Sequence, residues 1–215
     1  MPYGRGMTDA STPPLASVGR RDRRKERTRK ALVDAAIGIV NDEGIEAVTV
    51  AAVAARADIG FGTFYGYFDR KEDLLRSALQ AEFEAQALYN DALAAKAPDA
   101  IHRVASAVRA SISAIAHRPQ WQPLLIEWLL DGGLATRGAL FDRLRRDVKD
   151  GIDAGVFDPV GTAALPVVFA GAIVAVGSVD VRDRRVFESD AVAHLLQCLG
   201  VPASTARKAA NSSAG

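Results

Sequence analysis

The stretch TVAAVAARADIGFGTFYGYFDRKEDLL, residues 49–75, decides how this sequence folds. Thr49 is a favourable N-cap for a short helix that carries Val53 and Ala54. Asp58 interrupts the helical spacing, and a second short helical segment follows over residues 60–66. Two short helices joined by a tight turn indicate a helix-turn-helix DNA reader, although a structural helix hairpin with an aromatic plug has the same pattern.

A basic amphipathic helix precedes this stretch. Its apolar residues recur at steps of three and four, and a glycine follows where a C-terminal cap is expected: Leu32, Val33, Ala36, Ile37, Val40 and then Gly44. Residues 20–30, RRDRRKERTRK, hold eight basic and two acidic residues, a local charge of +6 in a chain of net charge +1. Such an arm suggests a polyanion partner such as nucleic acid, although charge runs are more often solvated segments.

Helical spacing continues after the stretch. Asp69 and Glu72 resemble a capping box that opens a long helix reaching about residue 95. Apolar stripes predict five further helices, over residues 101–115, 121–129, 140–152, 165–176 and 192–199. Because no run of alternating β-branched residues is present, the sequence predicts an all-α fold.

Composition excludes several classes of protein. The 215 residues are 49% hydrophobic and 25% charged, which is a globular balance. Cys198 is the single cysteine, so there is no internal disulfide or cysteine-built zinc site, and we expect it to be buried. The chain has three histidines, no nucleophile elbow, no phosphate loop and no metal-ligand spacing. The sequence therefore predicts no enzymatic activity, no metal and no cofactor.

The location is predicted from two segments. The first residues contain prolines and lack the apolar core of a signal peptide. Residues 159–179 are uncharged and nearly long enough to span a bilayer, but Pro166 lies near their start and no basic residue flanks them. A helix buried in a protein interface explains them better, so we expect a cytoplasmic protein with no membrane partner.

Residues 49–75 resemble the DNA-binding signature of the TetR family of bacterial transcriptional regulators. In that family a Thr opens the first motif helix, a turn leads to a recognition helix with Gly-Thr, an aromatic or Leu, and Tyr, and a Lys-Glu pair and two Leu follow. The matching residues are Thr49, Val53, Ala54, Ala57, Ile59, Gly62, Thr63, Phe64, Tyr65, Phe68, Lys71, Glu72, Leu74 and Leu75. The match covers about a quarter of the chain, and the helix count and length are also similar to that family.

The resemblance implies two domains, and the composition of the two ends, which lack helical periodicity, predicts a tail on each side of them. Residues 1–19 and 201–215 are expected to be disordered, residues 20–68 to form a three-helix DNA-binding domain, and residues 69–200 to form a six-helix-like effector-binding and dimerisation domain. Three positions depart from the family pattern: Asp58 replaces a turn Gly, Gly60 replaces a Ser or Thr cap, and Tyr67 replaces a His. Asp tolerates the left-handed conformation that such a turn requires.

The same resemblance implies which residues meet DNA. Phe61 and Thr63 are expected to face base edges, with Phe61 contacting a thymine methyl group unless it packs under the motif. Gly60 lets the helix approach the groove, and Phe64 and Phe68 are assigned to the core. The remaining DNA contacts are expected to be to the phosphate backbone: Arg27 in the basic arm, Thr49, Tyr65, Tyr67 and Lys71.

Effector and dimer contacts are assigned to the remainder of the chain. Candidate effector residues are the aromatic and scarce polar side chains of the middle helices, any of which would equally suit a plain core: Tyr89, His117, Trp121, Glu127, Trp128 and Phe169. The expected dimer interface is the uncharged helix and the last helix, through Leu165, Phe169, Ala172, Ile173, Val176, Leu195, Leu196 and Leu199. The family resemblance thus predicts a homodimeric repressor released from operator DNA by a small apolar effector. The alternative is a helical small-molecule sensor that has lost specific DNA binding.

Overall fold

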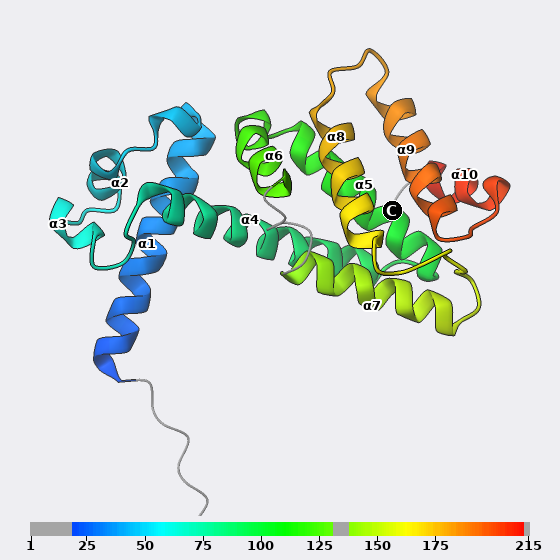
Figure 1. The fold of residues 1–215 in the computed structure, drawn as a ribbon, viewed down its shortest axis with the longest axis horizontal. Helices are drawn as coiled ribbons and strands as arrows, with labels where there is room; N and C mark the ends of the chain where they lie inside the picture. Colours follow the sequence, from blue (N-terminus) through cyan, green and yellow to red (C-terminus); the bar gives the residue numbers. More distant parts are fainter. Residues whose placement is uncertain (1–18, 131–137, 213–215) are drawn as a thin grey trace, which may run out of the picture.

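The computed structural model describes residues 19–130 and 138–212, and these ranges contain only helices and connecting turns (Figure 1). The predicted all-α fold is confirmed. The α-helices are α1 (Arg20–Glu43), α2 (Val50–Arg56), α3 (Phe61–Phe64), α4 (Lys71–Ala94), α5 (Ala100–Ala116), α6 (Gln122–Leu130), α7 (Ala139–Asp153), α8 (Leu165–Ser178), α9 (Arg184–Cys198) and α10 (Ala203–Asn211). Two 3-10 turns, η1 (Ile45–Ala47) and η2 (Pro119–Trp121), join them. The tail expected over residues 1–19 lies, except for Gly19, outside the described residues.

Helices α1 to α3 pack at one end of the elongated molecule, and α4 runs from them into the helical body (Figure 1). One apolar core joins these parts. It begins with Leu32 and Val53, continues through Phe64 and Leu79, and reaches Leu125 on α6. Because the core is continuous, a change in the body can be transmitted to the DNA-binding end without crossing a water-filled gap.

A second core holds the far part of the body together around α5. Ile112, Phe169 and Leu196 are almost completely buried there. Gly177 lets α8 approach α5 closely, because a Cβ at this position would lie 2.7 Å from the Ile115 Cβ. Burial of side chains of this size contributes roughly 1.5–3 kcal/mol each to stability.

The prediction that residues 201–215 form a disordered tail is wrong for most of that segment. Residues 203–211 form α10, whose Ala206 and Ala209 are buried against α5 and α9. The Arg109 guanidinium donates to the carbonyl oxygens of Ala210 and Ser212, which satisfies the C-terminal end of this helix. Alanines pack without forming a stripe of large apolar residues, so the pattern resembled a polar tail.

Two local predictions also need correction. Helix α4 begins at Lys71 with Arg70 as its N-cap, and no side chain caps it. The capping box predicted from Asp69 is therefore wrong, and Glu72 instead adds a favourable negative charge to the first turn. Cys198 is exposed, because it lies on the outward face of α9.

Candidate nucleic-acid interface and internal cavity

Thr49 fixes the start of α2, and Asp58 forms the turn between α2 and α3. The Thr49 Oγ1 accepts a hydrogen bond from the Ala52 N–H at 3.1 Å, so Thr49 is the N-cap that the sequence predicts. Asp58 has φ of 53°, which confirms that it takes the left-handed conformation of the turn. Gly60, the N-cap of α3, has φ of −66°, a conformation open to any residue. The glycine is therefore not required by the backbone.

Helix α3 is short and is anchored by one aromatic ring. Phe64 is fully buried and packs edge-on against Tyr65, with ring centroids 5.4 Å apart. On the outer side Phe61 is 55% exposed and Tyr65 is 53% exposed, and Thr63 is exposed between them. Phe61 therefore does not pack under the motif. The rings of Phe61 and Tyr65 and the hydroxyl groups of Thr63 and Tyr65 therefore project outward from α3 and its C-cap, above a buried core.

The remaining predicted DNA contacts differ in exposure. Arg27 and Thr49 are exposed, whereas Tyr67 is half-buried against the core. The Lys71 Nζ lies 3.5 Å from the Val48 carbonyl oxygen, a weak hydrogen bond that the ammonium group can exchange for a phosphate. Sequence reasoning assigned no specific contact to Arg29, whose guanidinium carbon lies 5.1 Å from the Phe68 ring centroid and so connects α1 to the segment that precedes α4.

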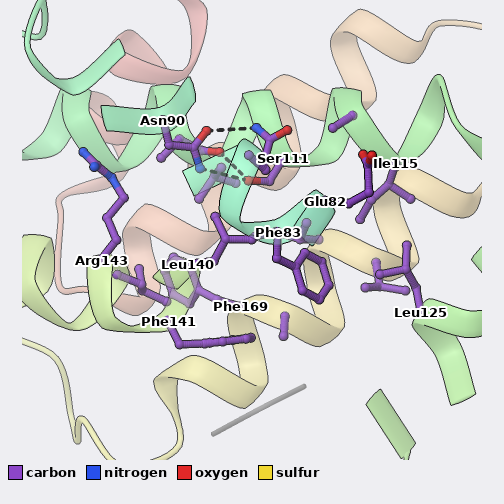
Figure 2. A pocket seen from close by; sticks show the side chains of 18 of the residues that line it. Glu82, Phe83, Asn90, Ser111, Ile115, Leu125, Leu140, Phe141, Arg143 and Phe169 are labelled. Carbon is purple, nitrogen blue, oxygen red and sulfur yellow. Dashed lines mark hydrogen bonds between the residues drawn. The ribbon is translucent and has the colours of Figure 1, made fainter. Parts of the chain in front are cut away.

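A cavity of about 140 Å³ lies in the body between α4, α5, α7 and α8 (Figure 2). Its walls are mainly apolar and include Phe83 on α4, Phe141 on α7 and Phe169 on α8. Leu125 of α6 closes one end. A cavity of roughly 150 Å³ holds a benzene-sized ring, so this space suits a small cyclic molecule.

Asn90 and Ser111 introduce polar atoms into the cavity (Figure 2). Asn90 is only 3% exposed, and its Oδ1 accepts a hydrogen bond from the Gln86 Nε2 at 3.0 Å. Its Nδ2 donates to the Ser111 Oγ at 3.4 Å, and that hydroxyl donates to the Ala107 carbonyl at 2.9 Å. The amide is therefore held in one orientation by neighbours on α4 and α5.

Arg143 adds a buried charge to the same cavity. It is 5% exposed, its Nε lies 3.4 Å from the Asp147 Oδ2, and it also forms an ion pair with Asp91. Its Nε and Nη1 nevertheless have no hydrogen-bond partner of good geometry. Burial raises the pKa of the Asp147 carboxyl above its ordinary value, and attraction to Arg143 and Arg103 opposes this only in part. The two ion pairs leave these buried donors without a well-aligned hydrogen bond, so an acceptor oxygen of a ligand placed here would be stabilised.

The predicted effector residues are mostly elsewhere. Phe169 lines the cavity, whereas Tyr89, His117 and Glu127 are exposed. Trp121 is buried, but its indole N–H donates to the Asn41 Oδ1 of α1 at 2.8 Å.

Trp128 lies behind the cavity wall, where it stacks on Phe83 with centroids 6.0 Å apart. Sequence reasoning missed Asn90, Ser111, Arg143 and Asp147. They could have been found from the sequence as polar residues at positions where the helical spacing predicts apolar ones.

The predicted dimer contacts are also placed differently. Leu165, Phe169, Leu195, Leu196 and Leu199 are buried in the protomer's own core, and Ala172, Ile173 and Val176 are half-buried against it. The five buried side chains are unavailable to a second copy, which corrects that part of the prediction, whereas the three half-buried ones stay a prediction. The outward faces of the same two helices carry a different set, defined here as the α8–α9 face: Val167, Val168, Gly171 and Ala175, with Phe187, His194 and Cys198.

Neither a membrane span nor a metal site emerges from the described ranges 19–130 and 138–212. No helix there combines the length and apolar character needed to cross a bilayer. No group of three or more His, Cys, Asp or Glu residues in those ranges is arranged to hold a metal ion.

Comparisons with known proteins place these features in context. Residues 32–78 match the sequence profile of the bacterial regulatory proteins of the tetR family. An uncharacterized HTH-type transcriptional regulator of Mycobacterium bovis is 30% identical over 172 residues, which cover 78% of each chain. The HTH-type transcriptional repressor KstR of Rhodococcus jostii is 46% identical over 79 residues, which cover 35% of this chain and only 37% of KstR. The crystal structure of RolR with the ligand resorcinol has a TM-score of 0.76 and 26% identity, covering 89% of this chain and 96% of RolR.

Proposed function

Since this chain belongs to the tetR family of bacterial regulatory proteins, we propose that it is a cytoplasmic transcriptional repressor that binds operator DNA as a homodimer and releases it when a small molecule fills the cavity. The observation that carries the proposal is the joint presence of an outward-facing α3 and an internal cavity on one continuous core. The similarity to KstR, a repressor by name, supports the direction of regulation.

DNA binding follows from the surface of α3. Phe61 and Thr63 project where a recognition helix meets base edges, and Lys71 and Tyr65 flank them as phosphate contacts. Two such helices in a homodimer read a near-palindromic operator whose half-site centres lie about 34–36 Å, or a multiple of it, apart.

Variants of these residues test the assignment. Phe61→Ala and Thr63→Ala should change sequence preference by roughly 1–3 kcal/mol per lost base contact. Lys71→Ala and Tyr65→Phe should weaken binding to all duplexes alike, because phosphate contacts carry no sequence information. The measurement is fluorescence anisotropy with the DNA upstream of the protein's own gene and with single-base variants of the bound site. If each of the four variants lowers the affinity for every DNA site by the same factor, the assignment of Phe61 and Thr63 to base contacts is wrong.

Dimerisation is supported by the α8–α9 face. Val167 and Val168 are 49% and 46% exposed, and nothing lies within 4 Å of the position that a Gly171 Cβ would take. The small and β-branched residues of α8, beside Phe187 on α9, leave an apolar surface on which a second copy can approach closely.

The cavity supports an effector of a definite kind: a single ring with one or two hydroxyl groups. The apolar walls suit the ring, and a hydroxyl oxygen would accept a hydrogen bond from Arg143 while its proton points to Asp147 or Asn90. The similarity to RolR, whose structure holds resorcinol, supports this class.

Resorcinol and 1,3-dimethylbenzene form a matched pair of probes, because they share a shape and differ in their hydroxyl groups. Calorimetric titration should show tighter binding of resorcinol to the wild type, since the dimethyl compound offers Arg143 no acceptor oxygen. Arg143→Met keeps the apolar stem and should weaken resorcinol binding by roughly 1.5–3 kcal/mol. Equal affinities of the two probes for the wild type would exclude the proposed polar contacts.

The second candidate function is a small-molecule sensor without specific DNA binding. It is favoured by Gly60, which supplies no capping hydroxyl at the start of α3. A wild-type protein that binds a probe in the cavity but shows no preference for any upstream duplex over random DNA would establish this alternative and overturn the repressor assignment.

A further inference from the structure

The charged side chains of the cavity form ion pairs with one another. Among the described residues that line it, Arg118 pairs with Glu82, and the Arg143 Nε lies 3.4 Å from the Asp147 Oδ2. The described lining therefore carries two cations and two carboxylates. Its charges balance before any ligand enters.

A further carboxylate acts on the cavity from outside its lining. Asp91 lies on α4, next to Asn90, and its side chain is 53% exposed. Its Oδ1 forms an ion pair with the Nη1 of the buried Arg143, which lies on the same side of the cavity as Asn90 (Figure 2). Asp91 is not among the residues that line the cavity, whereas Asp147 is. One buried guanidinium thus has two carboxylates, one inside the cavity and one at its outer edge.

Asp147 is also shared with a second arginine. The Arg103 Nε lies 3.8 Å from the Asp147 Oδ1, and the Arg103 Nη2 lies 3.9 Å from the Asp150 Oδ2. Burial nevertheless raises the pKa of the Asp147 carboxyl above its ordinary value, although Arg143, Arg103 and Arg146 all attract it. The positive charge around this carboxylate therefore does not fully compensate its burial, and another negative charge beside it would be unfavourable.

We propose that Asp91 makes the cavity selective for uncharged ligands, an inference that rests on the proposed effector site. A buried arginine alone would bind an aromatic carboxylate through charge-assisted hydrogen bonds. Here Asp91 and Asp147 already compensate the charge of Arg143, so a ligand carboxylate would be a third negative group on one guanidinium. A hydroxyl or amide group instead accepts from Arg143 and donates to Asp147 without adding charge. Asp91 is thus a specificity-determining residue that need not touch the ligand.

Benzoate and benzamide are matched probes of this selectivity. They share a planar ring and nearly the same shape, but at neutral pH benzoate is an anion and benzamide is uncharged. A charge within about 4–6 Å of a carboxylate typically changes its pKa by about one unit or more, which corresponds to a factor of about ten in an equilibrium constant. We therefore expect calorimetric titration of the wild type to show benzamide binding at least about tenfold more tightly than benzoate.

Asp91→Asn removes the outer negative charge and keeps the shape of the side chain. Arg143 is then compensated only from inside the cavity, so benzoate should gain affinity while benzamide changes little. Because water screens a half-exposed carboxylate, the ratio of the two dissociation constants should fall by about three- to tenfold. Since both proteins offer Asp147 as an acceptor, this change isolates charge from the hydrogen bond that only benzamide can donate.

Glu84→Gln is the matched control. Glu84 is an exposed carboxylate on the same helix and does not line the cavity. The substitution changes the net charge by the same amount, so it should leave the ratio of the two dissociation constants unchanged. Circular dichroism verifies that both variants are folded.

A wild type that does not prefer benzamide to benzoate would overturn the proposal, and that measurement needs no variant. An unchanged ratio in folded Asp91→Asn protein, or an equal fall in Glu84→Gln protein, would also overturn it. Binding of resorcinol in any of these cases shows that the proposed effector site survives, whereas a protein that binds none of the three compounds refutes that site as well. A protein that prefers benzamide but does not bind operator DNA refutes only the repressor assignment.

Discussion

Replacing Asn41 by Ala should weaken the connection between the DNA-binding end and the cavity wall. The Asn41 Oδ1 accepts the indole N–H of Trp121 at 2.8 Å, across 80 positions of sequence. Trp121 ends η2, and Leu125, one turn later on α6, closes the cavity. Arg118, just before η2, forms an ion pair with Glu82 on the opposite wall. The hydrogen bond therefore joins α1 to η2 and the start of α6, the segment that would contact a ligand in the cavity.

The magnitude follows from burial. Trp121 is 3% exposed whereas Asn41 is exposed, so Asn41→Ala leaves an indole N–H that water reaches in part, and the cost in stability should be about 1 kcal/mol, the lower end of the range for a buried donor that loses its partner. Asn41→Asp retains an acceptor oxygen and should cost much less. If the bond also transmits occupancy of the cavity, losing about 1 kcal/mol of the typical coupling free energy lowers the coupling about fivefold.

Two measurements test this reasoning. Urea unfolding of the wild type, Asn41→Ala and Asn41→Asp gives the stability difference. Operator affinity with and without resorcinol gives the coupling factor for each. Ser77→Ala is the matched control, because it removes the other α1 hydrogen bond to the body, Arg29 to Ser77, without touching η2. An Asn41→Ala protein with full coupling would refute the transmission, and one with full stability would refute the burial argument.

Further predictions concern packing, protonation and assembly. Gly151→Ala should destabilise the fold by about 1–3 kcal/mol or more in thermal unfolding, because the new Cβ would lie 1.9 Å from the Phe157 ring. Burial raises the folded-state pKa of Asp147 above 3.8, so the stability that this carboxyl contributes is present at low pH and is lost as pH rises through the raised value. The stability difference between wild type and Asp147→Asn should therefore decline above pH 3.8, and a rising difference would contradict the shift. Val168→Arg should convert a dimer to a monomer in sedimentation, whereas Leu88→Arg, on exposed α4 surface, should leave the dimer intact.

The sequence predicted those parts of the fold in which large apolar residues recur at helical spacing. It also placed Phe64 in the core. It failed where small residues pack, because the alanines of α10 bury little surface each and leave no conspicuous stripe. The dimer contacts were misassigned for a related reason: Phe169 and Leu196 are strongly apolar and therefore fill the protomer's own core. The cavity depends on contacts between five helices, and no single stretch of sequence reveals that Asn90 and Arg143 face the same space.

The length of α4 has a mechanical consequence. This helix has 24 residues and is about 36 Å long, with the cavity wall towards one end and the DNA-binding core at the other. A rigid tilt of about 5° at the cavity would displace the far end by about 3 Å, and the two protomers of a dimer would double this change in the separation of their recognition helices. Successive base pairs are about 3.4 Å apart. The two recognition helices would therefore be displaced from their half-sites by nearly two base pairs in total. A small ring could thus change the spacing of the two readers without altering a single atom of the surface that contacts DNA.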